Sequence, residues 1–80
     1  MSVRYFAGAA AAAGRDGEDV VLVPGSQLAD LAGELGRRHG AELTRVLTAC
    51  SFVLDEVAGP ADRPLHDGAQ VDVLPPFAGG

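Results

Sequence analysis

The amino-acid sequence predicts one α+β domain, in which a mixed sheet carries its main helix on one face. Eighty residues are enough for one core, and 48% apolar residues without a tryptophan indicate that Ala, Val and Leu build it. Two strand-like segments precede a strongly amphipathic segment, and two follow it. This order favours a helix over one face of a mixed sheet, and it leaves the other face to solvent or to a partner.

The first two strands are expected on either side of an alanine-rich loop. Residues 3–7 alternate in the manner of a strand. Residues 8–14 read GAAAAAG, which is too short to hold a helix alone, so we predict a loop with at most one helical turn. Residues 20–23 give a second strand, which ends at Pro24-Gly25. The two strands are close in sequence and should pair as a hairpin.

The main helix is predicted after Ser26, which is a preferred N-cap residue. Gly40 supplies the stop, and His39 before it is expected at the surface, near the negative end of the helix dipole. Between these ends the apolar residues recur at helical spacing. They are Leu28, Leu31, Ala32 and Leu35.

The second half of the chain predicts a short helix and two more strands. Residues 42–48 present one apolar helical face, and residues 50–54 alternate as a third strand. Residues 58–67 are rich in Gly, Pro, Asp and Arg, which indicates an irregular crossover. Residues 71–75 complete the sheet as its last strand.

The charge of the chain disfavours two classes of partner. Eleven acidic residues outweigh six basic ones, all of them Arg, and the net charge is −5. Such a domain is repelled by nucleic acid and by anionic membranes, so neither is expected as a partner. No segment approaches the roughly 20 apolar residues of a membrane span, and the opening MSVRYF lacks the apolar run of a signal peptide. We therefore expect a cytoplasmic protein.

A self-contained active site is not expected, and whether the chain counts as an enzyme stays open. No glycine-rich phosphate loop occurs, and a single cysteine allows neither an internal disulfide nor a cysteine-based metal site, so no metal is expected. Cys50 could be a nucleophile or a redox thiol, but a small apolar core residue is the favoured interpretation. His66 precedes Asp67-Gly68 and is expected in a turn.

The C-terminus is the candidate functional segment. We predict a domain over residues 1–75 and an extended tail over residues 76–80, which reaches about 16–18 Å when fully stretched. Two prolines stiffen its start, one aromatic ring offers an apolar anchor, and the final glycines have no Cβ, so they can thread a narrow channel. The residues expected to be presented to partner enzymes are Pro75, Pro76, Phe77, Ala78, Gly79 and Gly80.

These features resemble the MoaD/ThiS family of ubiquitin-like sulfur carriers, and within it the small subunits of molybdopterin synthase. The resemblance covers the whole chain, from VRYFAG at the start through the Pro-Gly-Ser entry to the helix. Its specific part is DGAQVDVLPPFAGG at the end. The resemblance implies the β-grasp fold, with Gly80 as the residue that carries sulfur.

The resemblance also implies a set of partners. A ubiquitin-activating-type enzyme would adenylate Gly80 with ATP, and a sulfur donor protein would supply the sulfur of a C-terminal thiocarboxylate. The large subunit of molybdopterin synthase would then use that sulfur to convert cyclic pyranopterin monophosphate to molybdopterin. The chain itself would bind no cofactor, because the ATP belongs to the activating enzyme.

Other functions remain open from the sequence. One is a sulfur carrier for thiazole (thiamine) or cysteine synthesis, although the Pro-Pro-Phe start of the tail favours molybdopterin. Another is a ubiquitin-like protein modifier, which could tag a target once but could not build chains on its own lysines, since it has none. The last is a small interaction module whose tail has no role.

Overall fold

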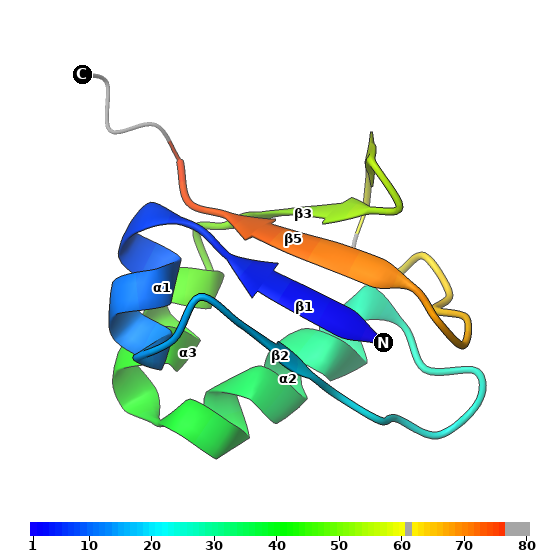
Figure 1. Cartoon of the computed structure of the whole chain (residues 1–80), viewed down its shortest axis with the longest axis horizontal. Helices are drawn as coiled ribbons and strands as arrows, with labels where there is room; N and C mark the ends of the chain where they lie inside the picture. The colour runs from blue at the N-terminus through cyan, green and yellow to red at the C-terminus, as the bar shows by residue number, and fades with distance from the viewer. Residues whose placement is uncertain (61, 77–80) are drawn as a thin grey trace.

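The computed structural model describes residues 1–60 and 62–76, where the predicted strands and helices occur in the predicted order together with one helix and one strand that the sequence did not predict. Three helices and five strands occur in this part of the chain (Figure 1). In order they are β1 (Ser2–Tyr5), α1 (Ala7–Ala13), β2 (Gly17–Asp19), α2 (Leu28–His39), α3 (Ala41–Leu47), β3 (Ser51–Leu54), β4 (Val57–Ala58) and β5 (Gln70–Leu74).

The strands form one mixed sheet with β5 at its centre. The order across the sheet is β2-β1-β5-β3-β4. β5 runs parallel to β1, with Ser2 opposite Gln70, and antiparallel to β3, with Ser51 opposite Leu74. The helices gather on one side of this sheet (Figure 1). The predicted α+β architecture is confirmed, including the mixed sheet and the helix on one face.

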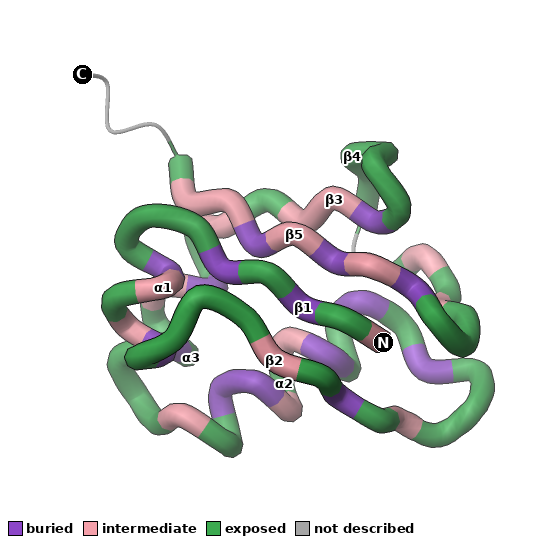
Figure 2. Tube along the Cα trace, viewed as in Figure 1, coloured by how far each residue is buried: buried purple, intermediate pink, exposed green. Residues whose placement is uncertain are grey.

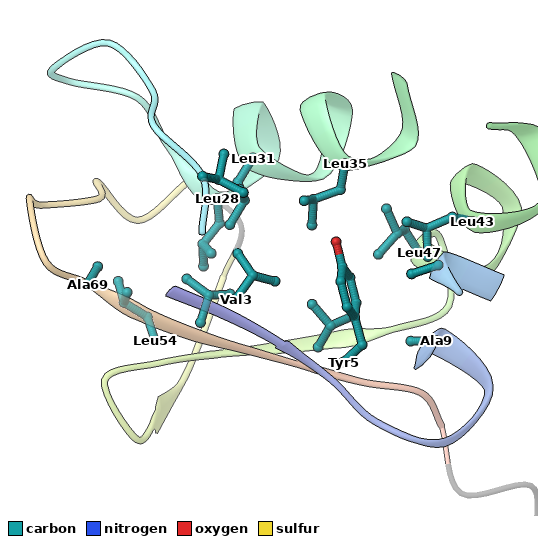
Figure 3. Close-up of a cluster of buried hydrophobic side chains, with 14 residues drawn as sticks. Val3, Tyr5, Ala9, Leu28, Leu31, Leu35, Leu43, Leu47, Leu54 and Ala69 are labelled. Carbon is teal, nitrogen blue, oxygen red and sulfur yellow. The ribbon is translucent and has the colours of Figure 1, made fainter. Parts of the chain in front are cut away.

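The core lies between that face of the sheet and the helices, as Figure 3 shows. Alternation in β1 turns Val3 and Tyr5 inward, and both are at most 3% exposed. The helical spacing of α2 brings three leucines onto the same face. The fully buried side chains with the largest volume are Leu28, Leu31, Leu35, Leu43, Val3, Val20, Val71 and Val73.

Helix α1 replaces the loop that the sequence predicted, so that prediction was wrong. Its seven residues are too few to be helical alone, but Ala9 and Ala13 are buried against the rest of the domain. Gly14 closes the helix with φ 75°, a conformation that glycine adopts without strain, and its N–H donates to the Ala10 carbonyl. Tertiary packing therefore supplies the stability that the local sequence lacks.

The second strand lies earlier than predicted. β2 covers Gly17–Asp19 rather than residues 20–23, and it pairs antiparallel with β1, so the expected pairing of the first two strands is confirmed. Gly17 fits there because a Cβ would meet the Val3 carbonyl oxygen at 2.8 Å. Of the apolar run, Val20 alone is buried. The hydrophobic run thus suggested a strand at residues 20–23, but pairing with β1 places the strand at Gly17–Asp19.

The N-cap residue of helix α2 lies one position later than predicted. Gln27, not Ser26, is the N-cap residue, and its backbone N–H donates to Asp30 Oδ2 at 2.8 Å. The Ser26 hydroxyl is buried and donates instead to the Val23 carbonyl at 2.7 Å. The end of the helix is as predicted, since Gly40 follows His39 with φ 100°. The short helix and the last two predicted strands are also present, each within two residues of the expected bounds.

The crossover contains a strand that the sequence did not predict. β4 pairs with β3 through a tight turn at Asp55-Glu56, where both residues have positive φ. Arg63 then fastens this hairpin, because its guanidinium donates to the carbonyls of Phe52, Val57 and Pro60. A two-residue strand carries too little periodicity to be recognised in sequence.

Candidate functional site

The tail predicted from the sequence starts after β5, the central strand of the sheet. Strands β1 and β3 flank it, and Val71 and Val73 are fully buried. Beyond Leu74 the ladder stops, with Pro75 half-buried and Pro76 exposed. Proline has no N–H to continue a ladder, which explains why the strand ends there. Whatever follows is therefore attached to a rigid base.

The remaining predicted site residues lie outside the described residues. These are Phe77, Ala78, Gly79 and Gly80, and their roles in partner binding and sulfur attachment stay predictions from the sequence. The division of the chain into residues 1–75 and 76–80 likewise stays a prediction.

A polar and aromatic group lies beside the base of the tail, on the face away from the helices. Arg4 donates to both carboxylate oxygens of Asp72, from Nε at 2.8 Å and from Nη2 at 2.9 Å. Its guanidinium carbon lies 5.7 Å from the centre of the Phe6 ring. The Phe6 N–H donates to the Val73 carbonyl at 3.2 Å, so Phe6 extends the contact between β1 and the end of β5. This arrangement presents an exposed ring and a neutralised ion pair beside the last residues of β5.

Sequence reasoning missed this group. The alternation of β1 places Arg4 and Phe6 on the face opposite Tyr5, and the alternation of β5 does the same for Asp72. What the sequence lacks is the parallel register that sets Arg4 opposite Asp72. That register arises from pairing across most of the chain length.

His39 belongs to a partly buried polar cluster, so its predicted surface position was wrong. Its side chain is 11% exposed, packs edge-on against the Tyr5 ring and contacts Glu18 Oε2. Glu18 also accepts hydrogen bonds from the Tyr5 hydroxyl at 2.6 Å and from Arg38 at 3.1 Å. The end of α2 lies against β2, which covers the helix terminus that the sequence left open to solvent.

The ionisation of this cluster follows from its contacts. Burial alone would raise the pKa of Glu18, but hydrogen bonds from Tyr5, His39 and Arg38 outweigh burial and lower it. Burial and the Glu18 carboxylate both raise the pKa of the Tyr5 hydroxyl. Glu18 is therefore kept in its ionised form and is not suited to donate a proton. The cluster joins β1, β2 and α2.

The two other residues weighed from the sequence have structural surroundings. Cys50 is half-buried against the core, and its thiol faces the Val46 carbonyl at 3.2 Å. Burial raises the pKa of the Cys50 thiol, which disfavours the thiolate needed by a nucleophile. His66 lies beside the turn at Asp67-Gly68, as predicted, and it contacts the Asp55 carboxylate.

Residues 1–60 and 62–76 hold no group of three or more His, Cys, Asp or Glu side chains placed to bind a metal ion. In the same part of the chain, no helix combines the length and apolar character needed to cross a membrane.

The five-stranded mixed sheet, the helix across it and the central last strand define a ubiquitin-like β-grasp domain. This class is confirmed by solved structures that share the fold over nearly the whole chain. More particularly, the ThiS family model matches residues 3–80, so the chain belongs to the ThiS family. The family resemblance drawn from the sequence is thereby confirmed.

Individual relatives agree over the full length. The chain is 34% identical over 82 aligned positions to the molybdopterin synthase sulfur carrier subunit of Chlamydomonas reinhardtii, covering 100% of this chain and 98% of that relative. A Pyrococcus furiosus structure described as molybdopterin converting factor subunit 1 is 26% identical, with TM-score 0.80 and 95% of each chain covered. SAMP1 from Haloferax volcanii has TM-score 0.87 at 22% identity, covers 100% of this chain and 98% of its own, and shows the fold alone.

Proposed function

We propose that this chain is the sulfur carrier subunit of a molybdopterin synthase, with sulfur carried as a thiocarboxylate on Gly80. The observation that carries the proposal is the 34% identity, over the full length of both chains, to a molybdopterin synthase sulfur carrier subunit. The base of the tail supports it, because a central strand gives the terminus a fixed starting point.

The proposed chemistry needs little from the carrier. A carboxylate is a poor electrophile, so the Gly80 carboxylate first attacks ATP, which releases pyrophosphate and leaves an acyl adenylate. The donor then delivers sulfur at the oxidation level of sulfide, which attacks the acyl carbon while AMP leaves. The product is a thiocarboxylate, which is nucleophilic through sulfur at neutral pH. The activating enzyme supplies ATP binding and acid–base groups, and this division of labour fits a chain whose described histidines and cysteine have structural contacts.

Three partners follow from the proposal. They are the large subunit of molybdopterin synthase, a ubiquitin-activating-type adenylating enzyme and a sulfur donor protein. A Helicobacter pylori structure with the same fold, at TM-score 0.69 and 24% identity over 99% of this chain and 96% of its own, is described as a complex of subunits 1 and 2 of molybdopterin-converting factor. An interface with the large subunit is thus the first partnership to test.

The experiment follows the mass of the chain. The protein is incubated with an activating enzyme, ATP and a sulfur donor, and we expect one terminal oxygen to be exchanged for sulfur, located at Gly80 by mapping the terminal peptide. Deleting Gly80, or adding one residue after it, should abolish the exchange and leave the thermal midpoint unchanged. Equal sulfur incorporation in either variant would contradict the proposal.

A second stage separates the pathways. The thiocarboxylated protein is mixed with the large subunit and cyclic pyranopterin monophosphate, and molybdopterin formation is measured. Sulfur that loads on Gly80 but passes only to a thiazole precursor or to a cysteine precursor would assign one of the alternative carriers. An isopeptide bond from the Gly80 carbonyl to a lysine of another protein would assign the modifier instead.

Phe77 gives a prediction about affinity. An apolar ring on a tail is suited to a pocket of the partner, where truncation at an interface hot spot costs on the order of 2 kcal/mol or more. Phe77→Ala should therefore weaken binding to the large subunit about thirtyfold or more, with a thermal midpoint close to that of the unaltered chain. Titration calorimetry and thermal unfolding of the same samples test this. A large loss of stability with normal binding would place Phe77 in the core.

A further inference from the structure

The apolar run after β2 is a second surface that the proposed function does not use. Val20 is buried and Leu22 half-buried, whereas Val21 and Val23 are 87% and 75% exposed. Figure 2 shows how the burial colours change along the segment that follows β2. The side chains thus alternate as in a strand, although residues 21–23 lie outside the sheet. β-branched side chains exposed on an extended edge are the kind of surface to which another strand adds.

The backbone of this run is open to a new partner. Val20 exchanges two hydrogen bonds with Met1, at 2.9 and 2.8 Å, and so continues the line of β2 at the sheet edge. Within residues 1–60 and 62–76, no backbone hydrogen bond joins Val21 or Leu22 to another segment. Because Val20 pairs with Met1, the N–H and C=O groups of its neighbour Val21 point to the open edge, where they can pair with an added chain.

The run is bordered by shallow hollows. One, of about 440 Å³, lies between residues 20–25, Met1 and residues 65–67. The other, of about 450 Å³, lies between residues 21–26 and Asp30 at the start of α2. The side chains of an added strand would have room on both sides of the edge.

Carboxylates outnumber cationic groups around the run. The cationic groups there are the Met1 amino group, which donates to the Val20 carbonyl, and His66, which contacts the Asp55 carboxylate. Asp19 precedes the run, Asp30 lines one hollow and Asp67 the other, and none of the three forms an ion pair within the described residues. No arginine lines either hollow. The arginines held in ion pairs lie elsewhere, at Arg4, Arg37, Arg38 and Arg45.

This edge and the end of β5 that leads to the tail lie at opposite ends of the sheet. Met1 and Val20 lie beside the start of β5, since Ser2 is opposite Gln70, whereas the tail follows Leu74. Four strand steps, about 13 Å, separate the two ends of β5. Figure 1 shows the same separation between the loop after β2 and the far end of β5. A molecule on this edge leaves the Leu74 end of β5 uncovered.

We propose that residues 20–25 form a docking edge for an extended segment of a partner protein in which apolar residues alternate with Lys or Arg. The segment adds to the sheet edge beside Val21 and Val23, and its basic side chains face Asp19, Asp30 and Asp67. A second copy of this chain is the poorer occupant, because it brings net charge −5 and no lysine to an acidic edge. The partner would hold the carrier while the tail occupies a separate active site.

The test uses the isotopically labelled full chain and a capped synthetic peptide in which Val alternates with Arg. We expect amide chemical shifts to change for residues 19–25 and hydrogen exchange to slow at Val21 and Val23. The double variant Val21→Ser/Val23→Ser should weaken binding at least about tenfold, since two apolar contacts are lost. Val57→Ser is the matched control, because Val57 is also exposed, at 62%, but lies on the opposite edge strand. It should bind the peptide as the unaltered chain does.

Two further peptides decide the mechanism. Replacing Arg with Glu, or methylating alternate backbone nitrogens, should remove binding, because the first reverses the charge and the second removes strand pairing. The proposal is overturned by an absence of binding at millimolar peptide, by equal binding of the Glu peptide or by shifts scattered over the acidic surface. A concentration-dependent dimer that Val21→Ser abolishes would also overturn it, in favour of a second copy. None of these readouts depends on sulfur transfer, so failure here leaves the proposed carrier function untouched.

Discussion

Helix α2 meets the sheet through leucine side chains, whereas the connection of residues 55–68 meets its neighbours largely through hydrogen bonds. Leu28, Leu31 and Leu35 are fully buried beneath the helix. In residues 55–60 and 62–68, by contrast, no residue is buried. The helix is therefore stabilised by a term that grows with apolar area, and the connection by directional contacts that depend on charge state and geometry.

The connection is nevertheless well fastened. Arg63 donates to three backbone carbonyls, the Leu65 N–H donates to the Ser26 carbonyl at 2.8 Å, and Asp55 Oδ1 accepts from the Gln70 N–H at 2.9 Å. These bonds tie the β3–β4 hairpin to the start of α2 and to β5. We therefore expect substitutions in the helix to change the free energy of global unfolding, and substitutions in the connection to change only its local opening.

The largest expected effect is on the helix side of this comparison. Leu35→Ala removes a fully buried side chain from the core and should lower the free energy of unfolding by about 2–5 kcal/mol. Val57→Ala, on the exposed β4 strand, should change it by less than about 0.5 kcal/mol. Chemical denaturation of both variants measures the two values. Equal losses in the free energy of unfolding would show that the helix does not contribute more to global stability than the connection.

A matched pair of glycines sharpens the comparison within α2. At Gly36 a new Cβ would clash with the Thr44 hydroxyl oxygen and lie 3.3 Å from the Thr44 Cβ, whereas at Gly33 it would meet nothing within 4 Å. Gly36→Ala should therefore push α3 away and destabilise the fold by about 1–3 kcal/mol. Gly33→Ala should stabilise it by about 0.5–1 kcal/mol, because alanine favours a helix. Thermal midpoints that move in the same direction would show that the approach of α2 to α3 does not require glycine.

Elements with local signals could be predicted from the sequence, whereas elements that depend on packing or pairing could not. Helix α2 was found from the sequence because its spacing and its glycine stop are local signals. Helix α1 and strand β4 were not, since Ala9 and Ala13 become helical only by packing and β4 exists only by pairing with β3. The apolar run of residues 20–23 was misassigned for the same reason: the register with β1 is not written in the run itself.

The candidate site divides in the same way. The two prolines, the aromatic ring and the glycines of the tail are contiguous, so the sequence alone singled them out. Arg4 and Asp72 are 68 positions apart and meet only through the parallel pairing of β1 and β5. Tyr5, Glu18 and His39 likewise come from three elements, and their cluster could not be found before the fold was known.

The smallest expected effect concerns the connection and its response to pH. His66 Nδ1 faces the Asp67 carbonyl at 2.8 Å, and Nε2 faces the Asp55 carboxylate. Both contacts favour a proton on each ring nitrogen, so the hydrogen bond to Asp55, followed by the bond to Asp67, raises the pKa of His66 above 6.5. The hydrogen bond from His66, followed by the one from Gln70, lowers the pKa of Asp55 below 3.8.

The signs of these shifts fix the pH range of the contact. The stability that the raised pKa of His66 contributes is complete below about pH 6.5 and is lost as pH rises through that raised pKa. The stability that the lowered pKa of Asp55 contributes is present above about pH 3.8 and is lost as pH falls through that lowered pKa. His66→Gln should therefore lower the thermal midpoint slightly near about pH 5.5 and less near about pH 8.5. The effect is small because both side chains are largely exposed, at 59% and 43%. An equal effect at both pH values would mean that the imidazole acts only as a neutral hydrogen-bonding group, and a large effect would mean that the connection takes part in global unfolding after all.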